Sequence, residues 1–374
     1  MSAETKSWLT SELRTIRNKA LKWFVINGRD LPWRRSSDPY VIWVSEIMLQ
    51  QTQVATVIPF FNRFLISFPN VVALANASLD DVYRHWAGLG YYRRARQLHQ
   101  AANKIVIDHG GVFPVEFSKV LELPGIGRYT AGAILSFSSD QRYPIVEANT
   151  QRLFARLLHL KTPTTTQESQ SQLWNFAELV LPRKSGSGHT NEALMEIGSQ
   201  ICLPKRPHCS LCPLQGHCPT FASGLQEWIP APKQAKVFTD LAEAALVIRD
   251  ERGRILMRRC GQEERWAGLW DFPRFDITGH SSPSIIRERL ASLFRERFGR
   301  AVLIGNDLYQ LKHAVTRYRI TLYSFEAQLD GKRKSKWNSG IERVWADHQL
   351  ISELALSSSG KRLWTWLKKY VPTS

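Results

Sequence analysis

Four of the five cysteines lie close together, at a spacing typical of a metal-binding loop. The pattern C-x6-C-x2-C-x5-C is formed by Cys202, Cys209, Cys212 and Cys218. Four thiolates this close can surround one metal centre. The uneven spacing suits a loop around a [4Fe–4S] cluster better than a zinc site, which uses two short cysteine pairs or recruits histidine. His208 and His217 are close enough to be alternative ligands, and Cys260 is expected to be a buried thiol.

A single carboxylate stands between an apolar stretch and an amphipathic helix in the segment YPIVEANTQRLFARLL, residues 143–158. Glu147 has three interpretations at this point. It is a surface charge, a group at a helix end, or one half of a catalytic pair of carboxylates.

A short glycine hairpin, LPGIGRYTAGAI (residues 123–134), separates two helical segments. Gly125 and Gly127 let the backbone turn tightly and direct N–H groups outward. Together with Arg128 and the N-terminus of the next helix, these groups suit a phosphate oxygen. An ordinary helix–turn–helix corner has the same glycine spacing. Beside the basic charge of the chain, binding to a DNA backbone is the better interpretation.

The composition points to a polyanionic partner. The 374 residues include 50 Lys and Arg against 33 Asp and Glu, a net charge of +17. Such an excess is typical of proteins that bind nucleic acid. No apolar run approaches the ~20 residues of a membrane span, and the polar start resembles neither a signal nor a transit peptide. Five cysteines are too few for a disulfide framework, so we expect a reducing, cytoplasmic compartment. We also expect a nucleoid-associated protein that is a monomer.

The chain divides into three parts by its patterns. Residues 1–222 are mainly helical, with glycine stops at Gly28, at Gly88–Gly90 and at Gly110–Gly111. Residues 223–237 carry two prolines and predict a linker. Residues 238–374 predict an α+β domain, because EAALVIRDERGRILMRRC has the form of a β-hairpin and YRITLYSFEAQL alternates like a strand.

Four segments together resemble the MutY-type adenine DNA glycosylases of the helix–hairpin–helix superfamily, which also contains endonuclease III. They are GRDLPWRRSSDPYVIWVSEIMLQQTQVATVIPFF, WAGLGYYRRARQLH, LPGIGRYTAGAI and the cysteine pattern. The resemblance runs through residues 10–220 and implies six-helix and [4Fe–4S] subdomains. WAGLWDFP (residues 266–273) resembles, more loosely, the start of that family's Nudix-like C-terminal domain. Such enzymes flip adenine, mispaired with 8-oxoguanine or guanine, out of double-stranded DNA and remove it.

The resemblance assigns the catalytic groups. Glu46 matches the acid proposed to protonate adenine N7, although a helix glutamate usually lies on a solvated face. Glu147 matches the carboxylate that stabilises the sugar cation, where the family has Asp-Gly-Asn and this chain has Glu-Ala-Asn. Asn149 is retained, and we expect it to cap the helix beginning at Thr150. Glutamate is one methylene longer than aspartate, and a misplacement of about 1 Å can cost about 10²-fold in rate.

The remaining assignments also come from the resemblance. Tyr129 stands where strand-cleaving relatives carry a nucleophilic lysine, so a monofunctional enzyme is expected. Arg34 and Glu192 match residues that line the adenine pocket, and a purely structural ion pair is the alternative. Residues matching those that enter the base stack beside 8-oxoguanine are Gln51, Leu89 and Tyr91.

The C-terminal domain departs from the family at its recognition loop. Where the family has Phe-Ser-His, this chain has Val315-Thr316-Arg317. Thr316 keeps a hydroxyl for the oxidised base, and Arg317 can donate to guanine acceptors or bind phosphate. The helix IIRERLASLFRERFGR (residues 285–300) lacks the paired glutamates of an active Nudix hydrolase, so we expect no nucleotide hydrolysis.

Two other functions fit the altered loops. One is a glycosylase of the same fold for another mismatched base, such as thymine. The other is a lesion-binding protein with weak catalysis, because Glu147 replaces the catalytic aspartate. Retention of Glu46, Tyr129 and Asn149 argues against the second, since a binding protein needs no acid.

Overall fold

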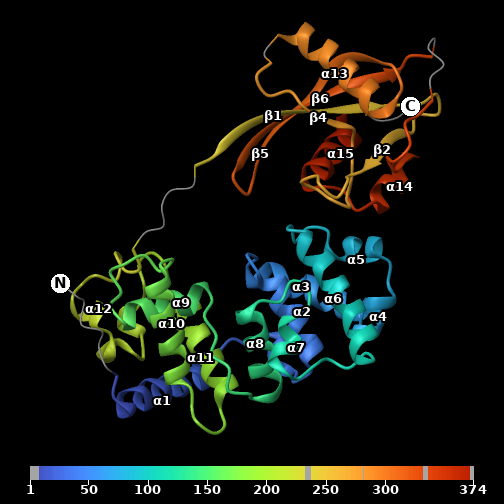
Figure 1. Cartoon of the computed structure of the whole chain (residues 1–374). Coiled ribbons are helices and arrows are strands. Elements are labelled where there is room, and N and C mark those ends of the chain that lie inside the picture. The colour runs from blue at the N-terminus through green and yellow to red at the C-terminus, as the bar shows by residue number, and fades with distance from the viewer. Residues whose placement is uncertain (1–7, 232–236, 281, 332–335, 371–374) are drawn as a thin grey trace. The chain divides into compact units, whose positions relative to one another are not determined.

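The chain forms two compact units (Figure 1). The helical unit comprises Met1–Ala77 and Arg93–Gln234, and the α+β unit comprises Ser78–Tyr92 and Ala235–Ser374. This computed structural model describes residues 8–231, 237–280, 282–331 and 336–370. The predicted linker, 223–237, includes residues 232–236, which lie outside the described residues, and its boundaries stay a prediction.

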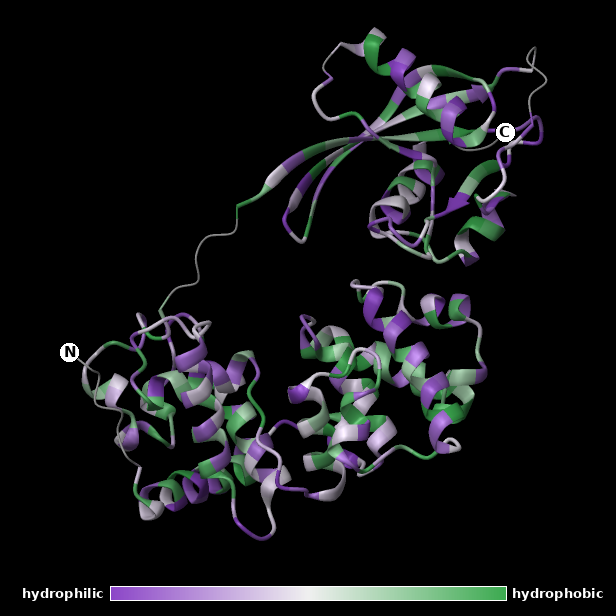
Figure 2. Cartoon of the chain, in the orientation of Figure 1, coloured by the Kyte–Doolittle hydropathy of each residue, from purple (hydrophilic) through white to green (hydrophobic). Residues whose placement is uncertain are grey.

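Helices dominate the chain as far as residue 222. They are α1 (Thr10–Asn27), η1 (Pro32–Arg35), α2 (Pro39–Leu49), α3 (Val54–Ser67), α4 (Val71–Asn76), α5 (Leu79–Trp86), α6 (Arg93–His109), α7 (Phe117–Leu121), α8 (Arg128–Ser139), α9 (Ala148–Leu157), α10 (Gln167–Val180), α11 (Ser187–Gln200), η2 (Cys209–Leu211), η3 (Gln215–His217) and α12 (Pro219–Ala222). The predicted stops at Gly28, Gly88–Gly90 and Gly110–Gly111 are confirmed. In Figure 2 many of these helices alternate hydrophobic and hydrophilic residues, as surface helices do. None of the helices among the described residues has the length and apolar character needed to cross a membrane.

The helical unit has a core shared by α1, α9, α10 and α11, which includes Ile16, Phe154, Phe176 and Ile197. Outside this core, α2 packs against α8. Eight of the eleven residues of α2 are buried, among them Trp43, Val44 and Met48. A helix buried almost all round excludes water from every side chain that it carries. Any polar group on α2 therefore needs a partner inside the protein.

Two glycines let α11 approach its neighbours closely. A Cβ atom on Gly188 would lie 2.5 Å from the carbonyl oxygen of Ser136, which belongs to α8. A Cβ atom on Gly198 would lie 2.8 Å from the carbonyl oxygen of Asn149, which belongs to α9. Both contacts are with backbone, which cannot move aside as a flexible side chain can. These positions fix how α8, α9 and α11 meet.

The predicted glycine hairpin lies between α7 and α8. Gly125 has a φ of +80°, which a glycine adopts without strain, and a Cβ there would also lie 2.9 Å from Cβ of Gln97. Gly127 is the N-cap residue of α8. The prediction of a helix–hairpin–helix is thus confirmed in its geometry.

The α+β unit contains two sheets. Its later elements are β1 (Thr239–Ile248), β2 (Ile255–Arg259), β3 (Trp270–Asp271), β4 (Arg274–Asp276), α13 (Pro283–Phe298), β5 (Val302–Val315), β6 (Tyr318–Leu329), β7 (Arg343–Ala346), α14 (His348–Glu353) and α15 (Ser358–Tyr370). One sheet has the order β4-β1-β6-β5, with β1 parallel to β6, and the other has the order β3-β2-β7.

The second half of β1, residues 244–248, is buried on both faces, which explains its continuous apolar sequence. Leu246 and Ile248 point to the core that includes Phe294 of α13. Ala245 and Val247 point to the opposite core, which includes Trp364 of α15. Helices therefore cover both faces of the four-stranded sheet.

The prediction of a hairpin between β1 and β2 is wrong. The two strands share only an isolated bridge, Arg249 to Ile255, beside the turn at Asp250. Beyond it β1 pairs with β4 and β6, whereas β2 pairs with β3 and β7. The local turn was identified correctly, but tertiary pairing separates the strands into two sheets. The strand expected in YRITLYSFEAQL is β6, which β5 joins in a true hairpin.

The close approach of α8 and α11 generates a stability prediction. Gly188→Ala should lower the free energy of unfolding by about 1–3 kcal/mol, the usual cost of overpacking, because its methyl group meets the backbone of Ser136. Gly216→Ala is the control, since a Cβ there has nothing within 4 Å. Urea denaturation measures both variants. Equal stability of the two would show that α8 and α11 separate at no cost.

Candidate active site

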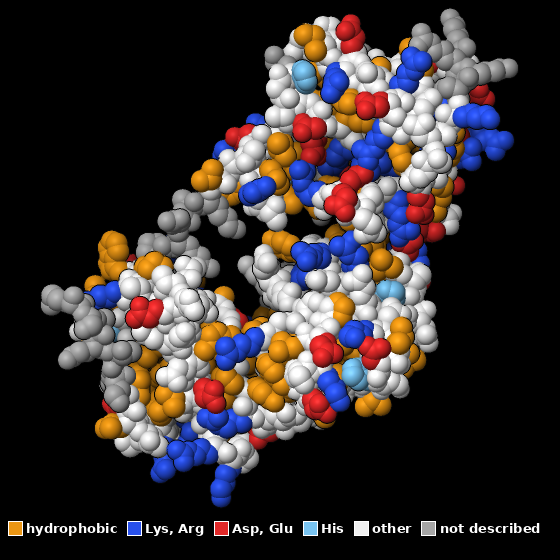
Figure 3. All heavy atoms as spheres, in the orientation of Figure 1, with side chains coloured by type: hydrophobic (Ala, Val, Ile, Leu, Met, Phe, Trp, Pro, Cys, Tyr) orange, Lys and Arg blue, Asp and Glu red, His pale blue; other side chains and the backbone are white. Residues whose placement is uncertain are grey.

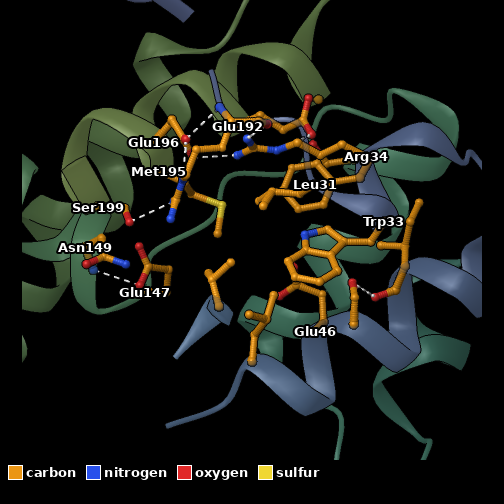
Figure 4. Close-up of a pocket in the computed structure, with 18 of the residues that line it drawn as sticks. Leu31, Trp33, Arg34, Glu46, Glu147, Asn149, Glu192, Met195, Glu196 and Ser199 are labelled. Atoms are coloured by element: carbon orange, nitrogen blue, oxygen red, sulfur yellow. Dashed lines mark hydrogen bonds and ion pairs between the residues drawn. The ribbon is translucent and has the colours of Figure 1, made fainter. Parts of the chain in front are cut away.

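A cavity of about 1520 Å³ opens in the helical unit. It brings together seven of the residues singled out from the sequence. They are Arg34, Glu46, Gln51, Tyr129, Glu147, Asn149 and Glu192. Figure 4 shows Glu46 and Glu147 on different helices, with both side chains directed into the same pocket. The two carboxyl groups therefore line one cavity.

Glu46 is a buried carboxyl group held by a tyrosine. Its helix, α2, starts at Pro39, and the side chain of Asp38 caps it by accepting from N–H of Tyr40. Glu46 is 5% exposed, and the hydroxyl of Tyr129 donates to its Oε2 at 2.6 Å. Burial raises the pKa of Glu46 to about 7, although the hydrogen bond from Tyr129 acts in the opposite direction. The nearby charge of Glu147 contributes to this rise of the pKa, so at neutral pH Glu46 is poised to hold a proton.

Glu147 is the N-cap residue of α9. Its Oε2 accepts from N–H of Asn149 at 2.7 Å, and its Oε1 accepts from N–H of Thr150 at 2.8 Å. Thr150 Oγ1 in turn accepts from N–H of Glu147 at 2.9 Å, which completes a reciprocal capping box. Burial raises the pKa of Glu147, and the two N–H groups offset part of that rise. The carboxylate is held at the positive end of the helix.

The expected role of Asn149 as a helix cap is wrong, because α9 begins at Ala148 and is capped by the preceding glutamate. Asn149 instead lies in the first turn, beside Gly198. Its Oδ1 accepts from Nη2 of Arg152 at 2.9 Å. Arg152 also donates to the carbonyl oxygens of Gly198 and Cys202. One guanidinium group therefore connects the cavity wall to the cysteine loop.

Arg34 and Glu192 form the ion pair that the sequence left open, and both line the cavity. Arg34 Nε lies 3.3 Å from Glu192 Oε1. Sequence reasoning missed two further residues here. Glu196 pairs with both Arg29 and Arg34, at 2.7 and 2.9 Å. The four-residue spacing of Glu192 and Glu196 on one helix was a signal for a shared face.

The four predicted cluster ligands line one small cavity of their own, between α9 and the loop 201–218. Arg156, which is buried, donates from Nη1 to Sγ of Cys202 at 3.1 Å. In the described part of the chain, no three Cys, His, Asp or Glu side chains are gathered as a site for a single ion. By chemical type alone, four cysteine sulfurs around one cavity are the donors that an iron–sulfur cluster takes.

The predicted phosphate contacts lie at the start of α8. Gly127 and Arg128 are exposed there, and the guanidinium carbon of Arg128 lies 3.9 Å from the ring centroid of Trp174. Such stacking holds a cation in place at an exposed site. Figure 3 shows Lys and Arg side chains on the surface of both units, in keeping with a polyanionic partner.

The three residues predicted to enter the base stack differ in exposure. Gln51 lines the cavity with a left-handed φ of +56°, after a turn whose carbonyl groups accept hydrogen bonds from Arg94. Tyr91, in the α+β unit, also has a left-handed φ, +49°, and is 51% exposed. Leu89 is 5% exposed, so its insertion stays a prediction.

The predicted recognition loop is the two-residue turn between β5 and β6. Thr316, with φ of +52°, and Arg317 are both exposed. The Thr316 hydroxyl donates to the carbonyl oxygen of Val315 at 2.7 Å. The guanidinium of Arg317 lies over the ring of Tyr318, with its Nη2 donating to that hydroxyl at 3.0 Å.

Comparison with known families covers both units. Residues 44–178 match the family described as HhH-GPD superfamily base excision DNA repair protein, and residues 244–366 match the NUDIX domain family. The predicted fold class, a helix–hairpin–helix glycosylase region with a Nudix-like α+β domain, is confirmed. A solved structure titled as a thermostable thymine-DNA glycosylase is similar, with 26% identity and a TM-score of 0.52 over 57% of this chain and 99% of that one.

Relatives with curated names agree with these matches. The adenine DNA glycosylase of Homo sapiens is 40% identical over 246 residues, which are 63% of this chain and 44% of the relative. The adenine DNA glycosylase of Buchnera aphidicola subsp. Baizongia pistaciae (strain Bp) is 30% identical over 351 residues, 94% of this chain and 96% of the relative. Because that similarity extends through both units, the chain belongs to the adenine DNA glycosylase family.

Proposed function

We propose that this chain is a monofunctional DNA glycosylase, which hydrolyses the glycosidic bond of adenine opposite 8-oxoguanine or guanine in duplex DNA. One observation carries the proposal. Two carboxyl groups in unlike environments, Glu46 and Glu147, line the same cavity, and the pKa of Glu46 is raised to about 7. Pairs of carboxyl groups with separated roles are the requirement for cleaving a glycosidic bond.

Glu46 supplies the proton. Adenine leaves deoxyribose poorly as an anion, so it must be protonated, and N7 is the position that the family resemblance assigns. A neutral Glu46 has that proton available, and the Tyr129 hydroxyl holds the carboxyl group in place. The target base reaches the cavity only if it is flipped out of the duplex, because its bond is otherwise inside the stack.

Glu147 stabilises the sugar cation that develops as adenine leaves. The two N–H groups of its helix fix the carboxylate, which therefore needs no reorganisation when positive charge appears. Among the described residues that line the cavity, none is a lysine able to form a Schiff base. Water then attacks the sugar, and the product is an intact strand with an abasic site.

The cysteine loop would hold a [4Fe–4S] cluster through Cys202, Cys209, Cys212 and Cys218. Bound there, the cluster supplies a cross-link that makes the loop one rigid element. Arg156 donates a hydrogen bond to Sγ of Cys202, and Arg152 connects the loop to Asn149. We place the protein on DNA in a bacterial-type cytoplasm, at the nucleoid.

Thr316 is proposed to distinguish 8-oxoguanine from guanine. Because its hydroxyl hydrogen is donated to Val315, the oxygen offers only lone pairs to a ligand. 8-Oxoguanine carries an N–H at position 7, where guanine carries a lone pair. Thr316 thus accepts from the oxidised base and repels the normal one. Arg317 has only donors, so it can serve guanine acceptors or a phosphate but cannot accept from the oxidised base.

Excision assays test the main proposal. Duplexes with 8-oxoguanine:A, G:A and G:T mispairs are treated with the enzyme, then with alkali to cleave abasic sites. We expect excision of adenine from the first two, and a loss of about 10²–10³-fold in the single-turnover rate for Glu147→Gln. Glu147→Asp restores the family residue and is the active control. Cleavage at G:T alone would favour a thymine glycosylase. Binding without excision would favour a lesion-binding protein. An adduct trapped with borohydride would exclude the monofunctional mechanism.

The rate of base release should depend on pH through Glu46. Its pKa is raised to about 7, so the acid is protonated below that pH, and the rate should fall about tenfold per unit above it. Tyr129→Phe removes the hydrogen bond that lowers this pKa, so the falling limb should move to higher pH. Single-turnover rates between about pH 5 and 9 measure both. A falling limb that stays in place, or moves down, would contradict the assignment.

Thr316 should affect discrimination more than excision. Thr316→Val keeps the branched shape at this left-handed position but removes the acceptor. The preference for 8-oxoguanine:A over G:A in kcat/KM should fall about tenfold, the worth of one net hydrogen bond. Thr316→Ser, which keeps the hydroxyl, is the control. An equal loss of kcat/KM on both duplexes would indicate that Thr316 contacts the DNA backbone instead of the base.

A further inference from the structure

Glu196 is the most heavily engaged carboxylate in the wall of the cavity. It is 1% exposed and lies on α11, one turn after Glu192. Its Oε1 accepts from the backbone N–H of Arg29 at 3.0 Å, from Nε of Arg29 at 2.7 Å and from Gln200. Its Oε2 accepts from Nη2 of Arg29 at 3.0 Å and from Nη2 of Arg34 at 2.9 Å. Burial alone would raise the pKa of Glu196, but the two arginines outweigh it and lower the pKa to about 2.

The two arginines belong to the segment that connects α1 with α2. Helix α1 packs on α11, whereas α2 carries Glu46 and packs on α8. Arg29 follows α1 directly, and Arg34 lies in η1, just before α2. Glu196 therefore fastens the connecting segment to α11 at the point where it passes the cavity (Figure 4).

Arg34 has a partner at each nitrogen of its guanidinium group. Nη1 donates to the carbonyl oxygen of Arg29 at 3.0 Å, Nη2 to Glu196, and Nε faces Glu192 at 3.3 Å. The guanidinium carbon of Arg34 also lies 4.9 Å from the ring centroid of Phe24. A group held on all sides cannot choose another rotamer. Arg34 in turn pairs with Oε1 of Glu192, while Nδ1 of the exposed His189 lies 3.2 Å from Oε2 of Glu192.

We propose that Glu196 is a positioning residue for the base pocket: it fixes Arg34, and through Arg34 it aligns Glu192 for the flipped base. Glu196 itself has no need to touch the base, since both its oxygens are occupied by protein donors. Pre-alignment of groups that contact a substrate raises the rate without new contacts, and misplacement by about 1 Å can cost about 10²-fold. This inference rests on the proposed function, because it assumes that a base enters the pocket.

If the ion pairs of Glu196 only stabilised the fold, a different result would be expected. Their loss would lower the melting temperature and leave the excision rate of the folded enzyme unchanged. A positioning role slows excision, leaves binding of the duplex backbone intact, and couples Glu196 to Glu192. Two residues that act through one arrangement show non-additive effects when both are changed.

The test is a double-mutant cycle on an 8-oxoguanine:A duplex. Glu196→Gln should slow single-turnover excision about 30- to 100-fold, while the Kd for a duplex with a non-cleavable adenine analogue changes less than about threefold. Glu192→Gln combined with Glu196→Gln should be no slower than Glu192→Gln alone. The matched control is Glu178→Gln, which breaks an ion pair with Arg142 (2.8 Å) outside the cavity and should leave excision within about twofold of wild type.

Two results overturn the proposal. One is a double variant whose loss is the product of the single losses, and the other is a Glu196→Gln enzyme that melts earlier but excises normally. If Glu196→Gln does not fold, Glu196→Asp takes its place in the cycle, because it keeps the charge and withdraws the carboxylate. A wild-type chain that excises no base overturns the proposed function and this inference together. An active wild type with multiplicative losses overturns this inference alone.

Discussion

The burial of one carboxyl group is the constraint on which the site depends. Glu46 lies on a helix with apolar neighbours on nearly every side, so its ionised form loses hydration that the protein does not replace. The protein supplies one hydroxyl donor, from Tyr129, and keeps the pKa near 7 instead of letting it rise further. Across the cavity Glu147 receives two backbone N–H groups. The carboxyl groups of Glu46 and Glu147 thus lie in one pocket but differ in how readily they hold a proton. Departure of a base with the help of an acid requires such a difference.

Helix α11 organises the other side of the pocket. Gly188 and Gly198 bring its backbone against α8 and α9, and its acidic residues Glu192 and Glu196 face the cavity from successive turns. A single element thereby contacts α8, Asn149 and the arginines at the cavity wall. From the same region Arg152 reaches both Asn149 and the carbonyl oxygen of Cys202. Arg152 is therefore a direct hydrogen-bonded connection between the cysteine loop and the first turn of α9.

Local signals in the sequence were enough for some elements and not for others. The glycine stops and the hairpin at Gly125 depend on residues a few positions apart, and these predictions agree with the structure. The separation of β1 and β2 depends on pairing with strands β6 and β7, whose partner residues are 79 (Thr239 to Tyr318) to 91 (Ile255 to Ala346) positions away, so the turn at Asp250 could not reveal it. Glu196 was missed for the same reason, because its partners Arg29 and Arg34 are more than 160 residues distant. Patterns within a window carry no information on such pairings.

The glutamate that replaces the family's aspartate illustrates how a helix end can absorb a change in side-chain length. Aspartate is a common N-cap residue and glutamate is not, because the longer chain usually passes beyond the first N–H groups. Here Glu147 has extended backbone, with φ of −122° and ψ of −177°, and both its oxygens still reach Asn149 and Thr150. The helix N-terminus therefore fixes where the carboxylate lies, because each of its oxygens accepts a backbone N–H there. Under this view the position of the negative charge is a property of α9, not of the length of residue 147.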